Sequence, residues 1–129
     1  MAYETNESGR FEIVVQPFPS FNDARHVSTS GGTQARWGAD DHEIYFLAPD
    51  GKLTSAPITT TRRGDRSTLE VGQPVALFPT RILNGDATVF RPQYAVSRDG
   101  RFLINQPAEE TTTTPVTLIL NWRPPASQQ

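Results

Sequence analysis

The stretch Tyr94–Pro107, YAVSRDGRFLINQP, decides how the whole chain is interpreted, because a Ser-x-Asp-Gly turn joins two short apolar runs. Apolar runs on either side of an Asp-Gly turn are typical of a β-hairpin. A fainter copy of the pattern, ARWGADDHEIYFLAP, occupies Ala35–Pro49. Two copies of one hairpin in a chain of 129 residues predict a repeat architecture.

Strand signals also dominate the rest of the chain, whereas helix signals are almost absent because 11 prolines and 9 glycines are scattered along it. Asp50-Gly51 and Asp99-Gly100 are expected to form two-residue hairpin turns, since glycine supplies the positive φ that such turns need. The polar segment TTTRRGDRSTLEVGQ is expected to be a protruding loop. About nine strands are predicted, at the spacing of an all-β domain: FEIVVQPF, ARHVST, TQARW, EIYFLA, KLTSAPIT, PVALF, QYAVS, RFLINQ and PVTLILNW.

Composition limits the classes of partner. The net charge is −2, so no general attraction to nucleic acid or to an anionic membrane is expected. The absence of cysteine excludes disulfides, thiolate metal sites and thiol nucleophiles. The first ten residues have no apolar core like that of a signal peptide, and no apolar run has the length of a membrane span. The compartment stays open, and no cofactor is predicted.

The hairpins resemble the Trp-Ser-Pro-Asp-Gly signature of TolB-type (WD40-like) β-propeller repeats. The chain as a whole resembles the C-terminal part of propellers attached to bacterial serine/threonine protein kinases. The family's turn is intact at Asp99-Gly100, whereas Asp41 replaces the glycine of the earlier copy, and Ala39 and Arg98 stand where proline is common. The resemblance covers Gly9–Trp122 and depends on VVQPFP, GGTQARW, IYFLAPDGKL, GQPVALFPTRI, YAVSRDGRFLIN and VTLILNW.

The resemblance implies an incomplete β-propeller of about two and a half four-stranded antiparallel blades, where a closed ring needs about 4–8. FEIVVQPF and ARHVST would end one blade, and TQARW, EIYFLA, KLTSAPIT and PVALF would form a complete second blade. QYAVS, RFLINQ and TLILNW would begin a third. Gly9 and Gly51 lie 42 positions apart, which suits one blade, whereas the turn residues Asp40 and Asp99 lie 59 apart.

The expected organisation is a propeller-blade domain at residues 9–122 between a flexible N-terminus, residues 1–8, and a flexible tail, residues 123–129. A truncated array exposes apolar blade faces and unpaired strand edges. We therefore expect a homo-oligomer that forms through these edges or faces. The alternative is a chain that departs from the parent fold and closes into a compact sandwich or barrel.

Candidate ligand-binding residues are few. Asp40, Asp41 and His42 fall in the sequence ADDHE, and Arg62 and Arg63 in a local basic cluster. Successive residues of an extended chain point to opposite faces, so ADDHE predicts a solvated turn rather than a metal site. No catalytic residue is assigned. The aromatic and aliphatic residues expected to pack between blades are Trp37, Phe46, Leu118, Leu120 and Trp122.

Three functional hypotheses follow. The first is a non-catalytic propeller fragment that serves as a protein-interaction or ligand-sensing module and self-associates. The second is a propeller-derived hydrolase or lyase, with Asp40 and His42 at its site, which requires acids and a histidine that converge in a pocket. The third is a gene fragment that folds by oligomerising and has no independent function. A propeller fold alone does not choose among them.

Overall fold

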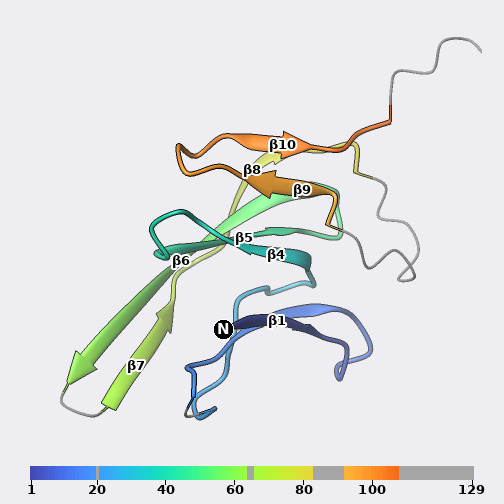
Figure 1. The fold of residues 1–129 in the computed structure, drawn as a ribbon. Helices are drawn as coiled ribbons and strands as arrows, with labels where there is room; N and C mark the ends of the chain where they lie inside the picture. Colours follow the sequence, from blue (N-terminus) through green and yellow to red (C-terminus); the bar gives the residue numbers. More distant parts are fainter. Residues whose placement is uncertain (20, 64–65, 83–91, 108–129) are drawn as a thin grey trace, which may run out of the picture.

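The computed structural model describes residues 1–19, 21–63, 66–82 and 92–107 (Figure 1). The described residues form ten β-strands and no helix, so the all-β prediction is confirmed. The strands are arranged in three antiparallel sheets, and none of these sheets closes into a barrel. The sheets lie one above another in Figure 1, with the N-terminal sheet at the bottom and the β9–β10 sheet at the top.

The first sheet has the order β1-β2-β3, with β1 at Ala2–Thr5, β2 at Glu12–Val15 and β3 at Arg25–His26. Residues 1–8 were expected to be flexible, whereas β1 pairs along its whole length with β2. The partner strand explains the difference, because β2 is buried throughout and its free edge leaves N–H and C=O groups that need partners. A four-residue strand that lacks an apolar alternation of its own gives no local signal for this pairing.

The second sheet is built on a meander of β4 (Thr33–Trp37), β5 (Glu43–Leu47), β6 (Lys52–Arg63) and β8 (Val75–Pro79). These are the four strands that were predicted to lie together in one sheet, as the complete second blade. The long β6 also pairs with β7 (Arg66–Val71) beyond the end of the meander.

The β6–β7 hairpin replaces the protruding loop predicted for TTTRRGDRSTLEVGQ. Thr60 lies opposite Leu69 in its register, and Leu69 is buried. Threonine is β-branched and favours extended backbone, so this polar run forms a strand once a partner is present. The prediction of a loop is wrong because a polar composition alone does not exclude a strand.

The third sheet contains β9 (Tyr94–Val96) and β10 (Phe102–Ile104), which pair antiparallel. Its predicted third strand, TLILNW, lies outside the described residues, and so does the predicted tail at residues 123–129. Leu118, Leu120 and Trp122 therefore have no structural description.

One backbone geometry recurs at four hairpin turns. In each turn the fourth residue has a positive φ, and its N–H donates to the carbonyl of the first residue. Ala48 N–H also donates to Lys52 O (2.9 Å), and Ser97 N–H donates to Arg101 O (2.9 Å). The loops at Asp50-Gly51 and at Asp99-Gly100 therefore contain three residues each rather than the predicted two. The glycine positions were nevertheless placed correctly at two of the turns. The residues with positive φ are Gly9 (86°), Asp41 (59°), Gly51 (79°) and Gly100 (77°).

We expect Gly100→Ala to lower the free energy of unfolding by about 1–2 kcal/mol, the cost of placing an L-residue in the left-handed region. No atom lies within 4 Å of a Cβ added at Gly100, so the loss would come from the backbone alone. Urea unfolding followed by far-UV circular dichroism measures it. Arg98→Ala, an exposed change in the same turn, is the matched control and should shift the value by less than about 0.5 kcal/mol.

The middle sheet is covered on both faces. Side chains of a β-strand alternate between faces, and along β5 they enter two different cores. Ile44 and Phe46 point toward the first sheet, whereas Tyr45 and Leu47 point toward the third. The first core consists of Ile13, Val15, Val27, Ile44, Phe46, Ala56, Ile58 and Leu69, with Trp37 packed against it. The second core consists of Tyr45, Leu47, Leu53, Ile82 and Tyr94.

Candidate binding face

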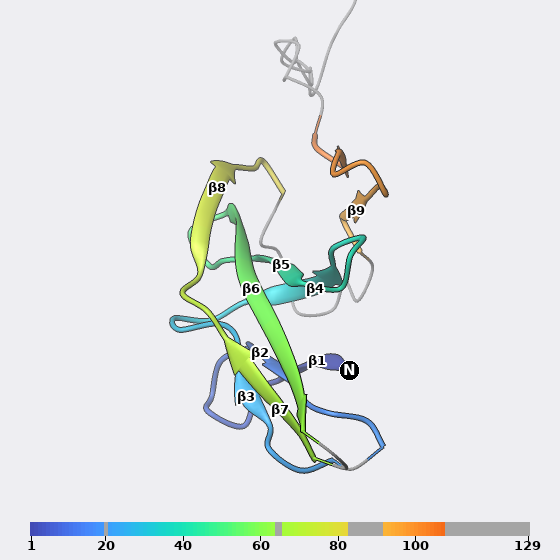
Figure 2. The ribbon, with the colours of Figure 1, turned by 90° about the vertical axis from the view of Figure 1, so that its left-hand side faces the viewer.

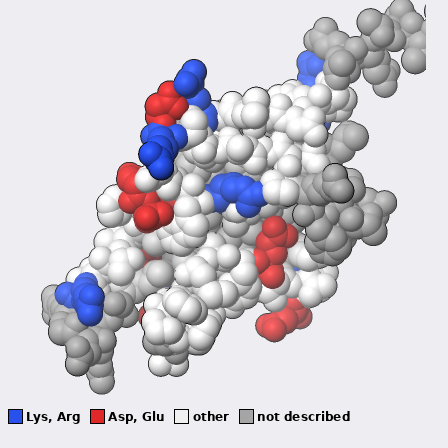
Figure 3. Space-filling view, viewed as in Figure 1, with Lys and Arg blue, Asp and Glu red and all other residues white. Residues whose placement is uncertain are grey.

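Three strand edges meet on one side of the molecule. Figure 2 shows β9, β4 and β1 one above another on the right, whereas β8 and β3 lie further to the left. Contacts between β1 and β4 and between β4 and β9 agree with this arrangement. We call the side formed by β1, β4 and β9 the edge face. It is the side that Figures 1 and 3 view from the front.

Gln34 is the central residue of the edge face. Its φ is +60°, in the left-handed region, and the register between β4 and β5 shifts between Thr33 and Arg36. Such a bulge turns an extra residue out of the regular ladder and re-aims its backbone groups. Here the Gln34 N–H leaves the sheet and donates to Glu4 Oε1 of β1, at 2.7 Å.

The other polar groups of Gln34 reach the third sheet. Its backbone carbonyl accepts a hydrogen bond from Tyr94 Oη (2.8 Å), and its side-chain Oε1 accepts one from Gln93 N–H (2.7 Å). One residue therefore joins all three sheets. The sequence gives no signal for this role, because a glutamine at the start of a strand predicts nothing about a contact 60 positions away.

Tyr94 remains a neutral hydrogen-bond donor over a wide pH range. Burial raises the pKa of its phenol, Arg36 opposes the rise, and the carboxylate of Glu4 adds to it. Glu4 and Arg36 thus both lie close enough to influence this ring electrostatically. The edge face therefore places a carboxylate and a guanidinium around one buried phenol.

The edge face is rich in hydrogen-bonding groups. Besides the Gln34 bonds, Asn105 Nδ2 donates to Gln93 Oε1 at 2.9 Å, so a second amide pair lies beside the first. Figure 3 shows basic and acidic side chains in small groups of both signs on this side, without a large patch of one sign. Amides and charges of both signs are the kinds of group that form hydrogen bonds with a peptide or a small polar molecule.

The residues proposed from the sequence lie elsewhere. Asp40, Asp41 and His42 are exposed in the turn between β4 and β5, where Asp40 Oδ1 accepts the His42 N–H (3.1 Å). Ile58 of β6 lies level with this turn, because its N–H donates to His42 O (2.7 Å). Arg62 is four residues further along β6, about 13 Å away at the rise of a strand.

The five sequence candidates therefore do not form a single site. Arg62 is exposed near the tip of the β6–β7 hairpin, and the Arg63 side chain lies outside the described part of the chain. The convergence of acids and histidine in a pocket that a hydrolase or lyase would need is not seen at Asp40 and His42, which are both exposed. Across the described ranges, no group of three or more histidine, aspartate or glutamate side chains is placed to hold a metal ion.

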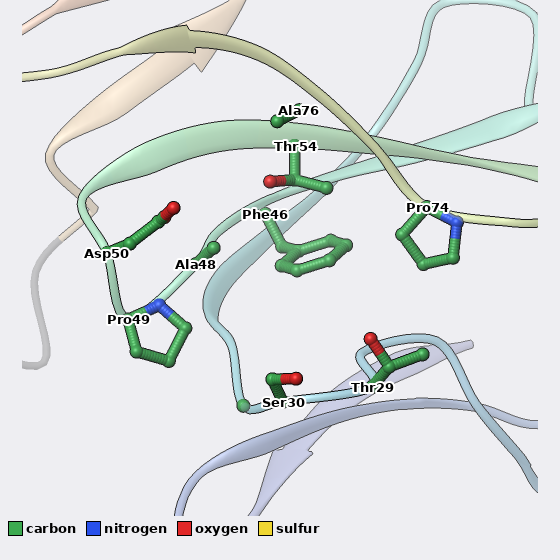
Figure 4. Close-up of a pocket in the computed structure, with 10 residues that line it drawn as sticks. Thr29, Ser30, Phe46, Ala48, Pro49, Asp50, Thr54, Pro74 and Ala76 are labelled. Atoms are coloured by element: carbon green, nitrogen blue, oxygen red, sulfur yellow. The ribbon is translucent and has the colours of Figure 1, made fainter.

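A hollow of about 330 Å³ lies between the connection from β3 to β4 and strands β5, β6 and β8. Figure 4 shows the Phe46 ring in its middle, between Thr54 above and Ser30 below, with Pro49 and Pro74 on either side. None of the five sequence candidates lines this hollow. Its lining is more apolar than polar, and Phe46 connects it to the first core.

A polar cluster faces the third-sheet side of β5. Tyr45 Oη and Ser55 Oγ both donate to the carboxylate of Glu43, the latter at 2.5 Å. Burial, followed by the Glu43 hydrogen bond and charge, raises the pKa of Tyr45 to about 12. Each hydroxyl has the carboxylate as its partner, so the cluster ties β5 to β6.

A second buried carboxylate, Glu12, ties β2 to the chain that follows β3. Only 4% of Glu12 is exposed, and its carboxylate accepts hydrogen bonds from Ser28 Oγ and from Arg10 Nε (2.5 Å). Burial alone would raise its pKa. The Ser28 hydrogen bond, the Arg10 hydrogen bond and charge, and the Gly31 N–H outweigh burial and hold the pKa of Glu12 below its ordinary value of 4.5.

We expect Glu12→Gln to flatten the acid dependence of stability. Because the folded-state pKa is lower than the unfolded one, the carboxylate stabilises the fold above about pH 4.5, and this contribution disappears as the pH falls through the folded pKa. Urea unfolding at a series of pH values measures the free energy of unfolding. A variant that loses stability between pH 5 and pH 3 as steeply as the parent protein would contradict this assignment.

Comparison with known proteins gives no match: no protein-family model, no curated protein and no solved structure is significantly similar to this chain. Among the described residues, no helix has the length and apolar character needed to span a membrane.

Proposed function

We propose that the chain is a non-catalytic interaction module, a sector of a TolB-type β-propeller that self-associates. Its support comes from the order of the strands. Four antiparallel strands, β4, β5, β6 and β8, lie side by side in this order, as in a propeller blade, and a further sheet packs on each face. The turn with a left-handed fourth residue, which occurs four times, is a second repeated feature of the chain.

The observation that carries the proposal is the outward face of the third sheet. Phe102 and Ile104 pack toward the second core, whereas Leu103 between them is 77% exposed. Ala95, its partner across the sheet, is also exposed. In a stacked array each unit covers the faces of its neighbours, so a sheet at the end needs a further unit or a polar cap. The described part of the chain supplies neither.

The edge face supplies the second half of the proposed role. In the proposed propeller, β4 and β9 would be the innermost strands of their blades, around the central axis, and β1 would lie beside β4. A protein segment or a small polar ligand would bind there through the groups around Gln34, and this binding needs no cofactor. Glu4, Arg36 and Gln93 are the residues that we assign to it, in place of the five sequence candidates.

The mass of the protein in solution tests the proposal. Light scattering coupled to size-exclusion chromatography, repeated over a hundredfold dilution, should show a defined oligomer at high concentration that dissociates on dilution. A strict monomer at every concentration would exclude a self-associating sector.

A further inference from the structure

Two apolar features lie at opposite ends of the three-sheet stack. Phe18 and Phe21, in the connection between β2 and β3, are 70% and 53% exposed, and we call them the aromatic pair. Ala95 and Leu103, on the outward side of the third sheet, form the end face. The β2–β3 connection lies at the bottom of both Figure 1 and Figure 2, whereas the third sheet lies at the top.

The aromatic pair is held in place by its own connection. Phe18 and Phe21 pack edge to face, with ring centroids 5.5 Å apart at 88°. Phe21 N–H donates to Pro17 O (3.2 Å), and the Gln16 side-chain amide donates to Phe21 O. An ion pair of 2.6 Å between Arg25 and Asp23 closes the far side.

The backbone of this connection is strained, although its two aromatic rings are exposed. Phe21 has φ +50°, a conformation that bulky residues rarely adopt, and Asp23 has φ +63°. Two large aromatic side chains are nevertheless kept in solvent. Backbone strain that presents exposed groups is found at binding sites, where the return comes from the partner.

The chain itself shows how such an apolar surface is covered. The first sheet packs on the second, and the second on the third, each time through apolar side chains from facing strands. The end face would continue this series, since it is the next face along the stack. If a second copy stacks in the same direction, the end that meets this end face is the one that carries the aromatic pair.

We propose that copies of this chain associate head to tail, with the aromatic pair of one copy packed on the end face of the next. The inference rests on the proposed self-association and specifies its geometry. The contact is heterologous, because it joins two different surfaces, and it therefore leads to a ring or an open chain rather than to a dimer with a two-fold axis.

Mixing two defective variants tests the geometry. Phe18→Lys disrupts the aromatic pair, and Leu103→Lys disrupts the end face. Both residues are exposed, so both variants should keep the β-sheet circular dichroism of the parent protein. Each variant alone should fall to the mass of a single chain. An equimolar mixture should give a two-chain species, because the intact aromatic pair of the Leu103→Lys variant packs on the intact end face of the Phe18→Lys variant. The other two surfaces carry the substitutions and cannot bind a third chain.

Ala39→Lys, an exposed change in the β4–β5 turn, is the control and should keep the parent mass. If the parent protein is an oligomer but the mixture stays monomeric, or if either variant keeps the parent mass, head-to-tail association is wrong and self-association stands. If the parent protein is itself a monomer, both proposals fail.

Discussion

Phe46→Ala is expected to lower the free energy of unfolding by about 3–5 kcal/mol, the usual loss for a buried phenylalanine. Phe46 is 2% exposed and belongs to the first core. Its ring also lies against the connection from β3 to β4, where a Cβ added at Gly32 would stand 2.7 Å from Phe46 Cδ2. Removing the ring would therefore enlarge the adjoining hollow, and a small domain has only about 5–15 kcal/mol to lose.

Urea unfolding of the parent protein and the variant measures the effect, at the lowest workable protein concentration so that association contributes least. Phe18→Ala makes the same chemical change at a side chain that is 70% exposed, and should lower the free energy of unfolding by no more than about 0.5–1.5 kcal/mol, the value of its contact with Phe21. Equal losses in the two variants would show that the first core does not hold the first and second sheets together.

The strands that the sequence predicted best are those whose signal is local. EIYFL and FLI carry short apolar runs, and a glycine in a turn follows or precedes each of them. Alternation along a strand and the positive φ of a turn residue both depend on neighbours in the chain, so both can be read without a structure. Asp41 shows the same turn with a different residue, at φ +59°.

The elements that the sequence missed depend on a distant partner. The first strand, β1, is held by β2, and the β6–β7 hairpin continues from a strand that already belongs to the meander. Neither segment has an apolar run of its own. Their backbone groups pair because an open edge lies nearby, and which edge is open depends on the whole fold.

The candidate site was harder to predict for the same reason. Acids, histidine and arginines are candidates for a binding site by residue type. Asp40, however, lies in the turn between β4 and β5, whereas Arg62 lies near the end of β6. Gln34 and Gln93 are unremarkable by type, and come together across 59 positions. The predicted number of blades stays a prediction, since TLILNW, the strand expected to follow β10, lies outside the described residues.

Gln34→Pro is expected to lower the free energy of unfolding by about 3 kcal/mol, because proline lacks the N–H donor and fixes φ near −65°. At Gln34 the backbone has φ +60°, and its N–H donates to Glu4 at 2.7 Å. The bulge that joins the three sheets would have to reverse its backbone. Urea unfolding at matched protein concentration measures the loss.

Gln34→Gly separates the backbone role of this residue from its side-chain role. Glycine adopts φ +60° without strain and keeps the N–H, so the gain of about 1–2 kcal/mol from removed strain offsets the lost side-chain hydrogen bond of about 0.5–1.5 kcal/mol. Stability should change little, whereas the Gln93 amide proton should exchange faster with solvent, because it donates to Gln34 Oε1. If the two variants lose the same stability, the side chain rather than the left-handed backbone joins the sheets. If neither variant loses stability, the three sheets are held by their cores alone.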